Sequence, residues 1–183
     1  NQYDNIFHEH IGFHSLKSIQ DLCKINNLKV FDVDKIDSQG GSIRCFICKL
    51  KSPKKISKNI KELNSLEARS NLFSSTYLRK FKQKIIKHSE NLNKLIKTLK
   101  MRDKKISVYG ASGKGQALLQ FCKIDKKLIN FVFDKSNLKQ GLFTPGTNIK
   151  IKSPKYISRK SVDYLLILSW NIKREIIKQE TKF

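Results

Sequence analysis

The sequence predicts an α/β protein, and three patterns along the chain support this fold class. A β-rich run at residues 105–109 ends in a turn with three glycines, after which a helical pattern covers 114–122. Two other apolar runs, 128–133 and 162–168, have the length and composition of strands. Apolar residues recur at three- and four-residue steps over 76–100, which predicts a long amphipathic helix ahead of these strands.

The glycine turn has the composition of a phosphate-binding loop. Gly110, Gly113 and Gly115 let the backbone turn tightly and bring N–H groups close to an anion. The N-terminus of the following helix adds a partial positive charge, and Lys114 adds a full one. The spacing is Gly-x-x-Gly-x-Gly and therefore does not indicate a nicotinamide cofactor. A tight strand-to-helix turn that binds no ligand is the simpler alternative.

A mostly parallel sheet is expected in the C-terminal part. Strand 128–133 ends in Asp134, near the position where an acidic residue binds a ribose hydroxyl in dinucleotide folds. A short strand at 149–151 and the run 162–168, apolar enough to be buried on both faces, extend the sheet. Ligands of such sheets bind at the carboxyl ends of the strands. The loops after 105–109, 128–133 and 162–168 are therefore expected to line one crevice.

The N-terminal part predicts one helix and two strands. Ser15 or Ser18 can cap a helix with a regular apolar period. Strands are expected at 29–33 and 42–50, and Pro53 ends the second one. These elements complete the edge of a larger sheet but cannot form a complete domain alone.

The formal net charge of +23 raises the question of a nucleic-acid partner. Lysines spread over almost every segment carry most of this charge. Arginine, which phosphate-binding and sequence-reading proteins favour, stands only at positions 44, 69, 79, 102, 159 and 174. Basic residues are not interleaved with aromatic ones, as they are in single-strand binders. The sequence therefore favours a solvated lysine surface that helps to attract an anionic ligand, with no nucleic-acid partner.

The cysteines and the chain ends bear on metal binding and location. Cys45 and Cys48 form a Cys-x-x-Cys pair, but in a strand positions three apart project to opposite faces and do not easily share a metal. No metal site is expected, and the thiols are expected to be free in a reducing cytoplasm. No apolar run approaches the roughly 18 residues of a membrane span, so no membrane partner is expected. The start lacks a Met and a signal-peptide pattern, so we expect a piece of a longer cytoplasmic protein.

Five blocks of the sequence occur in the order known from one enzyme family. They are Phe-His-Glu-His at 7–10, Gly-Gly-Ser-Ile-Arg at 40–44, Tyr-Gly-Ala-Ser-Gly-Lys-Gly at 109–115, Lys-Gln-Gly-Leu-Phe-Thr-Pro-Gly-Thr at 139–147 and Leu-Ile-Leu-Ser-Trp-Asn at 166–171. With these blocks the chain resembles, over nearly its whole length, the S-adenosylmethionine-dependent C-methyltransferases that act on nucleotide-linked keto-deoxysugars.

The resemblance implies a domain organisation. Residues 1–53 correspond to the end of a class I methyltransferase sheet, 54–103 to a helical connector, and 104–183 to a Rossmann-like domain that binds the nucleotide sugar. The family's zinc-binding module and its glycine-rich loop for S-adenosylmethionine are expected upstream of residue 1. The chain alone is therefore expected to bind no zinc and to be inactive.

The resemblance also implies a reaction and its residues. A proton is removed from the carbon next to a ketone, and the resulting enolate attacks the sulfonium methyl group of S-adenosylmethionine. His10 is the implied base, Glu9 contacts substrate or orients the site, and His8 is a weaker candidate. Phe7 stands where the family usually has tyrosine, so a role of that hydroxyl does not carry over. The simpler alternative is that these histidines are polar surface and capping residues.

The nucleotide sugar is expected to bind along the C-terminal crevice. The implied contacts are the glycine-turn residues and weaker candidates on the neighbouring loops, namely Gly110, Ala111, Ser112, Gly113, Lys114, Gly115, Asp134, Lys139, Thr147, Trp170 and Asn171. Ser112 as a helix cap and Trp170 as a packing residue are the simpler alternatives. Two other functions stay open, a Rossmann-like nucleotide-binding module without chemistry and, less favoured, a basic nucleic-acid binder.

Overall fold

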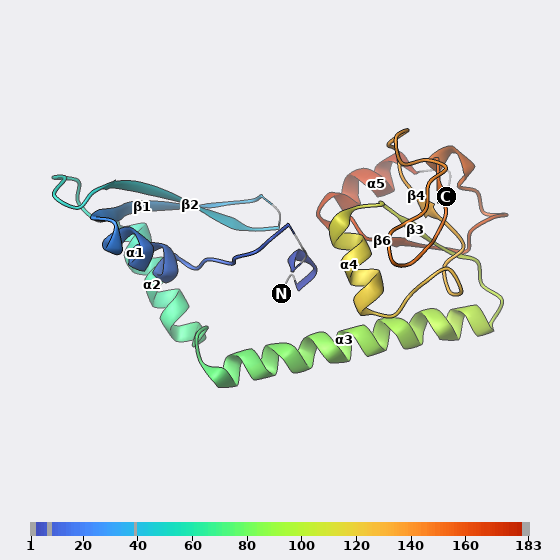
Figure 1. Cartoon of the computed structure of the whole chain (residues 1–183), viewed down its shortest axis with the longest axis horizontal. Helices are drawn as coiled ribbons and strands as arrows, with labels where there is room; N and C mark the ends of the chain where they lie inside the picture. The colour runs from blue at the N-terminus through green and yellow to red at the C-terminus, as the bar shows by residue number, and fades with distance from the viewer. Residues whose placement is uncertain (1–2, 7–8, 39, 181–183) are drawn as a thin grey trace. The chain divides into compact units, whose positions relative to one another are not determined.

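The computed structural model describes residues 3–6, 9–38 and 40–180 (Figure 1). The chain forms two compact units. The first, here called the C-terminal unit, comprises residues 1–10 and 83–183, and the second, the hairpin unit, comprises residues 11–82. The segment borders at 53 and 103 stay predictions of the sequence.

The hairpin unit packs two helices on a two-stranded sheet. It contains α1 (Leu16–Ile25), the antiparallel strands β1 (Leu28–Ile36) and β2 (Ser42–Lys49), and α2 (Lys58–Ser70). The helix and the two strands expected here are confirmed, with β1 longer than predicted. Its core consists of Leu16, Cys23, Val30, Val33, Ile60 and Leu63.

Helix α1 begins at a reciprocal cap. The Ser15 hydroxyl accepts from the Ser18 N–H at 3.2 Å, and the Ser18 hydroxyl accepts from the Ser15 N–H at 3.0 Å. The Glu67 carboxylate on α2 accepts from the N–H groups of Leu16 and Lys17, at 2.7 and 3.1 Å. These bonds satisfy donors that a helix start leaves open, and the negative charge suits the helix dipole. They confirm Ser15 as the cap.

The long predicted helix is confirmed as α3 (Ser75–Met101), which contains the border between the units at residues 82 and 83. In the C-terminal unit, Leu92, Ile96 and Leu99 of α3 lie in or against the main core. These side chains recur at steps of three and four, which places them on one helix face.

The C-terminal unit is built on a parallel four-stranded sheet in the order β5-β4-β3-β6. Its strands are β3 (Ile106–Tyr109), β4 (Val132–Phe133), β5 (Ile151–Lys152) and β6 (Tyr164–Ile167). All residues of the central strand β3 are buried. This sheet and its helices confirm the α/β fold class.

Two strand predictions need correction. Of the predicted strand 128–133, only 132–133 are strand, because residues 125–129 form a turn in which Asp125 accepts from the backbone N–H groups of Lys127, Leu128 and Ile129. The run 162–168 is not buried on both faces. It forms β6 at the edge of the described sheet, where Tyr164 is 46% exposed.

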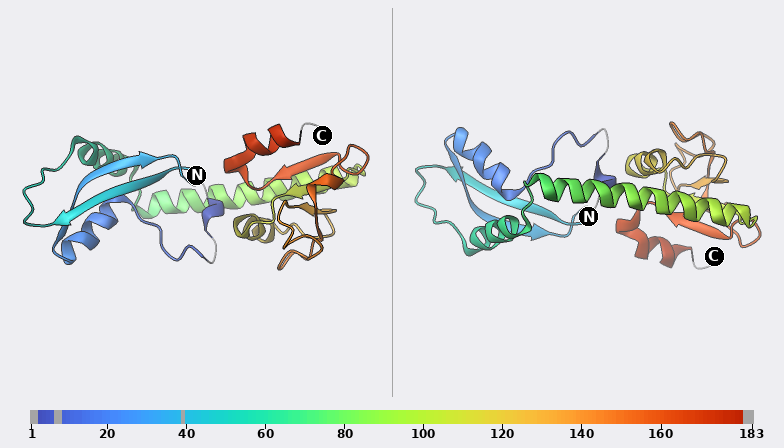
Figure 2. Two further views of the ribbon diagram at one scale, coloured as in Figure 1. Left: turned by 90° about the horizontal axis from the view of Figure 1, so that it is seen from above. Right: turned by 90° about the horizontal axis from the view of Figure 1, so that it is seen from below.

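Helices cover both faces of this sheet. Helices α3 and α4 (Gly113–Phe121) pack with Val108 on one face, and α5 (Lys173–Gln179) packs through Ile176 with Tyr109 on the other. Successive strand residues point to opposite faces, so Val108 and Tyr109 lie in the cores on opposite sides of the sheet. Figure 2 shows the sheet between α4 and α5.

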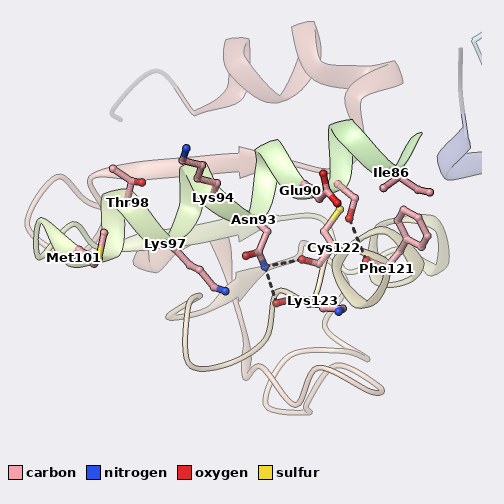
Figure 3. Close-up of a pocket in the computed structure, with 11 residues that line it drawn as sticks. Ile86, Glu90, Asn93, Lys94, Lys97, Thr98, Met101, Phe121, Cys122 and Lys123 are labelled. Atoms are coloured by element: carbon pink, nitrogen blue, oxygen red, sulfur yellow. Dashed lines mark hydrogen bonds between the residues drawn. The ribbon is translucent and has the colours of Figure 1, made fainter. Parts of the chain in front are cut away.

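Helix α4 is fastened to α3 at its C-terminal end. The Asn93 side-chain amide donates to the carbonyl oxygens of Cys122 and Lys123, at 2.7 and 3.1 Å (Figure 3). Both carbonyls lie where the helix ends and internal donors are lacking. The groove of about 770 Å³ beside this contact is lined by none of the residues predicted to bind the substrate.

The Tyr109 phenol gives a first testable prediction. Its hydroxyl donates to Glu180 Oε1 at 2.9 Å, and burial, followed by the Glu180 interaction, raises the pKa of Tyr109. The unfolded chain therefore loses this proton first as the pH rises. The stability that Tyr109 contributes is complete below about pH 10 and is lost above it.

The unfolding free energy should therefore fall as the pH rises above about 10, and Tyr109→Phe should make this fall less steep. Urea unfolding followed by Trp170 fluorescence at several pH values measures it. Tyr164→Phe, at a half-exposed tyrosine, should leave the fall unchanged, and an equal effect of both would contradict the assignment.

Candidate functional site

The loop after β3 has a fixed conformation at its first glycine. Gly110 has a φ of +98°, a region that L side chains rarely adopt, and its N–H donates to the Phe133 carbonyl at 2.8 Å. A Cβ on Gly110 would lie 2.6 Å from Ser169 Oγ. The loops after β3 and β6 therefore meet here, as expected from the sequence.

The turn continues into a capped helix. The Ser112 hydroxyl accepts from the Gly115 N–H at 3.2 Å, so Ser112 is the N-cap of α4. A Cβ on Gly115 would lie 2.8 Å from Leu168 Cδ1 and 3.0 Å from Leu168 Cβ. Gly115 is thus required for close packing of α4 against the chain after β6. Gly113 is exposed and Lys114 half-buried in the first turn of this helix.

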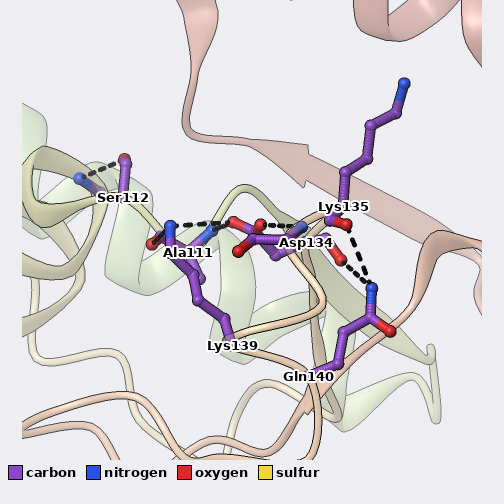
Figure 4. A network of polar contacts seen from close by, with 8 residues as sticks. Ala111, Ser112, Asp134, Lys135, Lys139 and Gln140 are labelled. Carbon is purple, nitrogen blue, oxygen red and sulfur yellow. Dashed lines mark hydrogen bonds and ion pairs between the residues drawn. The ribbon is translucent and has the colours of Figure 1, made fainter.

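Asp134 joins the loops after β3 and β4 (Figure 4). Its Oδ2 accepts from the Ala111 N–H and its Oδ1 from the Ser136 N–H, both at 2.8 Å. Lys139 Nζ lies 3.6 Å from Asp134 Oδ2 and donates to the Ala111 carbonyl at 2.9 Å. The carboxylate is 14% exposed and the lysine side chain 45% exposed. These contacts fix the loop after β3, and they leave the Lys139 side chain partly accessible to solvent beside it.

The other predicted contacts have different settings. Trp170 and Asn171 lie exposed in the short helix η3 (Trp170–Ile172) after β6, where the Trp170 indole N–H donates to Asp4 Oδ2 at 2.6 Å. Thr147 is buried. Its hydroxyl donates a hydrogen bond to Gln116 Oε1 and shares a second hydrogen bond with the Thr144 hydroxyl. Its described contacts thus do not join it to the group around Asp134.

The histidine motif lies partly within the described residues. His8 is outside them, and Glu9 and His10 are exposed. His10 Nδ1 lies 2.9 Å from the Asn5 carbonyl oxygen, a distance at which the ring nitrogen donates. Residues 1–10 belong to the C-terminal unit, so this segment and the glycine turn are parts of one compact body. No sequence pattern indicates a role for Tyr3, Asp4 or His88, because their contacts join segments far apart in the chain.

The Cys-x-x-Cys pair shows the geometry of an ordinary strand. Cys45 faces the hairpin core, and burial, followed by the interactions with Cys23 and Glu67, raises the pKa of the Cys45 thiol. This shift disfavours the thiolate that a metal requires. Within residues 3–6, 9–38 and 40–180, no group of three or more His, Cys, Asp or Glu side chains is arranged to hold a metal. Over the same ranges no helix combines the length and apolar character needed to cross a bilayer.

The C-terminal unit thus combines a parallel sheet, a glycine turn at the carboxyl edge of that sheet and the segment with the histidine motif. The family model for the C-methyltransferase C-terminal domain matches residues 37–183, and the chain belongs to this family. It is 33% identical over all 183 residues to C-methyltransferase NovU of Streptomyces niveus. The chain spans 44% of the length of that relative. These matches confirm the resemblance drawn from the sequence blocks as one to C-methyltransferases.

Replacing a helical glycine by alanine usually stabilises a protein, but the close approach of α4 to Leu168 predicts that Gly115→Ala destabilises this one. Gly115→Ala should lower the unfolding free energy by about 1–3 kcal/mol, because the new methyl group overpacks against Leu168. In an open helix the same change raises it by up to about 1 kcal/mol. Urea unfolding followed by Trp170 fluorescence measures the effect. In a Leu168→Ala background the cost of Gly115→Ala should shrink, and an undiminished cost would show that the contact is not its cause.

Proposed function

We propose that this chain is the C-terminal part of an S-adenosylmethionine-dependent C-methyltransferase that acts on a nucleotide-linked keto-deoxysugar in the cytoplasm. The observation that carries the proposal is the match of residues 37–183 to the C-methyltransferase C-terminal domain. The activity itself is part of the proposal, since the chain spans 44% of the matched relative. The substrate is a small molecule, with neither nucleic acid nor membrane as partner.

The diphosphate of the substrate binds at the carboxyl edge of the sheet. The first turn of α4, with Gly113 and Lys114, supplies backbone N–H groups, the positive end of the helix dipole and an ammonium group. Lys139 adds a second cation, held beside the loop by the Ala111 carbonyl. Two backbone N–H groups and Lys139 offset the charge of Asp134, so its carboxylate orders the loop without opposing the anion.

The chemical step uses the N-terminal histidine motif. Because His10 Nδ1 donates to the Asn5 carbonyl, its proton sits on Nδ1 and the basic lone pair is on Nε2. Nε2 takes the proton from the carbon next to the ketone, and the C–H electron pair delocalises into the carbonyl to give an enolate. That pair would form the new bond to the methyl carbon of a bound donor as the donor's carbon–sulfur bond breaks and its electron pair stays on sulfur. Glu9, next to this base, contacts or orients the sugar. His8 stays a candidate outside the described residues.

The methyl donor and zinc are assigned to other parts of the enzyme. S-adenosylmethionine, when bound, supplies an electrophilic methyl group. The resemblance implies a donor site and a zinc-binding module outside this chain, and the chain spans 44% of the length of the matched relative. We propose that both belong to other parts of the enzyme.

The diphosphate site can be tested on the chain itself. Lys139→Gln should weaken the binding of thymidine diphosphate about tenfold, because it removes a charge-assisted hydrogen bond. Isothermal titration calorimetry at fixed salt measures the affinity. Lys127→Gln is the matched control, since it changes the net charge equally in the 125–129 turn before β4.

Equal weakening by both lysine changes would mean that the general charge of the surface binds the anion. Tight thymidine diphosphate binding with no methyl transfer by the full-length enzyme would favour the nucleotide-binding module without chemistry. An oligonucleotide that displaces thymidine diphosphate, with steep salt dependence, would favour the nucleic-acid binder.

The base assignment calls for the full-length enzyme. His10→Asn should lower kcat for methyl transfer to a nucleotide-linked keto-sugar about 100-fold or more, the usual loss on removing a general base. KM should change little, since the diphosphate contacts remain. His14→Asn is the control, because His14 lies four residues away on the exposed segment before α1. A His10→Asn enzyme with the wild-type rate would sink the mechanism.

A further inference from the structure

The described residues just before the histidine motif form a short helical turn, η1 (Tyr3–Asn5), in the C-terminal unit. The turn packs against α4 and borders a cavity of about 530 Å³ that side chains of α3, α4 and β6 also line. The cavity walls are mostly apolar, and polar groups of the turn meet polar groups of the unit at its rim. Two side-chain pairs make these polar contacts.

The first pair joins the turn to the end of β6. The Trp170 indole N–H donates to Asp4 Oδ2 at 2.6 Å, a charge-assisted hydrogen bond between residues 166 positions apart in the sequence. Trp170 lies two residues beyond Leu168, which contacts the glycine turn's helix through Gly115. Asp4 is thus fixed relative to the carboxyl edge of the sheet.

The second pair joins the turn to α3. The Tyr3 hydroxyl lies 2.8 Å from His88 Nδ1, and the two rings meet edge to face with centroids 5.5 Å apart. The Tyr3 ring also lies against Phe121 of α4, with centroids 5.9 Å apart. Burial, followed by the interactions with Cys122 and Asp4, raises the pKa of Tyr3, so the phenol keeps the proton that it can donate. Tyr3 therefore holds the turn against two helices at once.

The turn Tyr3–Asn5 also contacts the imidazole ring of His10. The carbonyl of Asn5, the last residue of the turn, accepts from His10 Nδ1 at 2.9 Å. A backbone carbonyl accepts but never donates, so this contact selects the tautomer with the proton on Nδ1. The selection depends on where Asn5 is held, and the contacts of Tyr3 and Asp4 in the same turn help to hold it.

We infer that the turn Tyr3–Asn5 is a positioning element for His10, clamped by the pairs Asp4–Trp170 and Tyr3–His88. This role requires no contact between the four side chains and the substrate, and it is separate from the predicted substrate contact of Trp170. Their effect on rate rests on the proposed function, whereas their effect on the orientation and tautomer of His10 does not.

The first experiment measures the tautomer without any substrate. In the chain labelled with ¹⁵N-histidine, NMR shifts of the ring nitrogens should show His10 mainly as the Nδ1–H tautomer. The double variant Tyr3→Phe, Trp170→Phe removes both side-chain hydrogen bonds and keeps most of the apolar packing. It should shift His10 toward the Nε2–H form that predominates in free histidine. Tyr164→Phe is the control at an unrelated tyrosine of the same unit and should change nothing. Circular dichroism verifies folding, and the two single variants, each expected to give part of the shift, serve if the double variant does not fold.

The second experiment measures rate in the full-length enzyme. The double variant should lower kcat about tenfold or more with KM changed by less than about twofold, because the base is displaced while the diphosphate contacts stay. An unchanged His10 tautomer in the folded variants would overturn the inference. An unchanged kcat despite a shifted tautomer would also overturn it, as far as catalysis is concerned. A wild-type enzyme without methyl transfer would contradict the proposed function. The tautomer measurement would still show whether the pairs Asp4–Trp170 and Tyr3–His88 position His10.

Discussion

The carboxylate of Asp134 is the contact on which the candidate site depends. It accepts from backbone N–H groups on both sides, Ala111 after β3 and Ser136 after β4, and it keeps Lys139 close by. A parallel sheet places the ends of neighbouring strands at one edge but leaves their loops to find their own structure. Here one nearly buried acidic group sets the path of both loops. Lys139 is held at these loops by its contacts with Asp134 and the Ala111 carbonyl.

The same unit contains both halves of the proposed chemistry. Residues 1–10, at the start of the chain, and the glycine turn, more than a hundred residues later, belong to one compact body. The diphosphate of a substrate and the base that acts on its sugar ring would therefore be held by a single core. Enzymes gain much of their rate from such fixed distances between the point of binding and the reacting group.

The sequence predicts well what local patterns determine and poorly what distant residues determine. Three features could be predicted because each depends on neighbours in sequence. They are a serine cap at 15 or 18, the apolar period of α3, and the strand, glycine turn and helix from 105 to 122. The strand prediction at 128–133 was too long because the Asp125 turn competed with it. That Asp134 bonds the loop backbone, and that Tyr3 meets His88, depends on tertiary proximity that no spacing rule records.

The missing side chain at Gly115 restricts how this edge of the protein can respond to a ligand. Where even one methyl group would overlap Leu168, helix α4 has no slack to tilt or slide against the sheet. A ligand at this edge would then be accommodated by long, partly exposed side chains such as Lys139, with the backbone as a rigid template. Under the proposed function, selection at this edge would rest on a shape present before binding more than on a movement of α4.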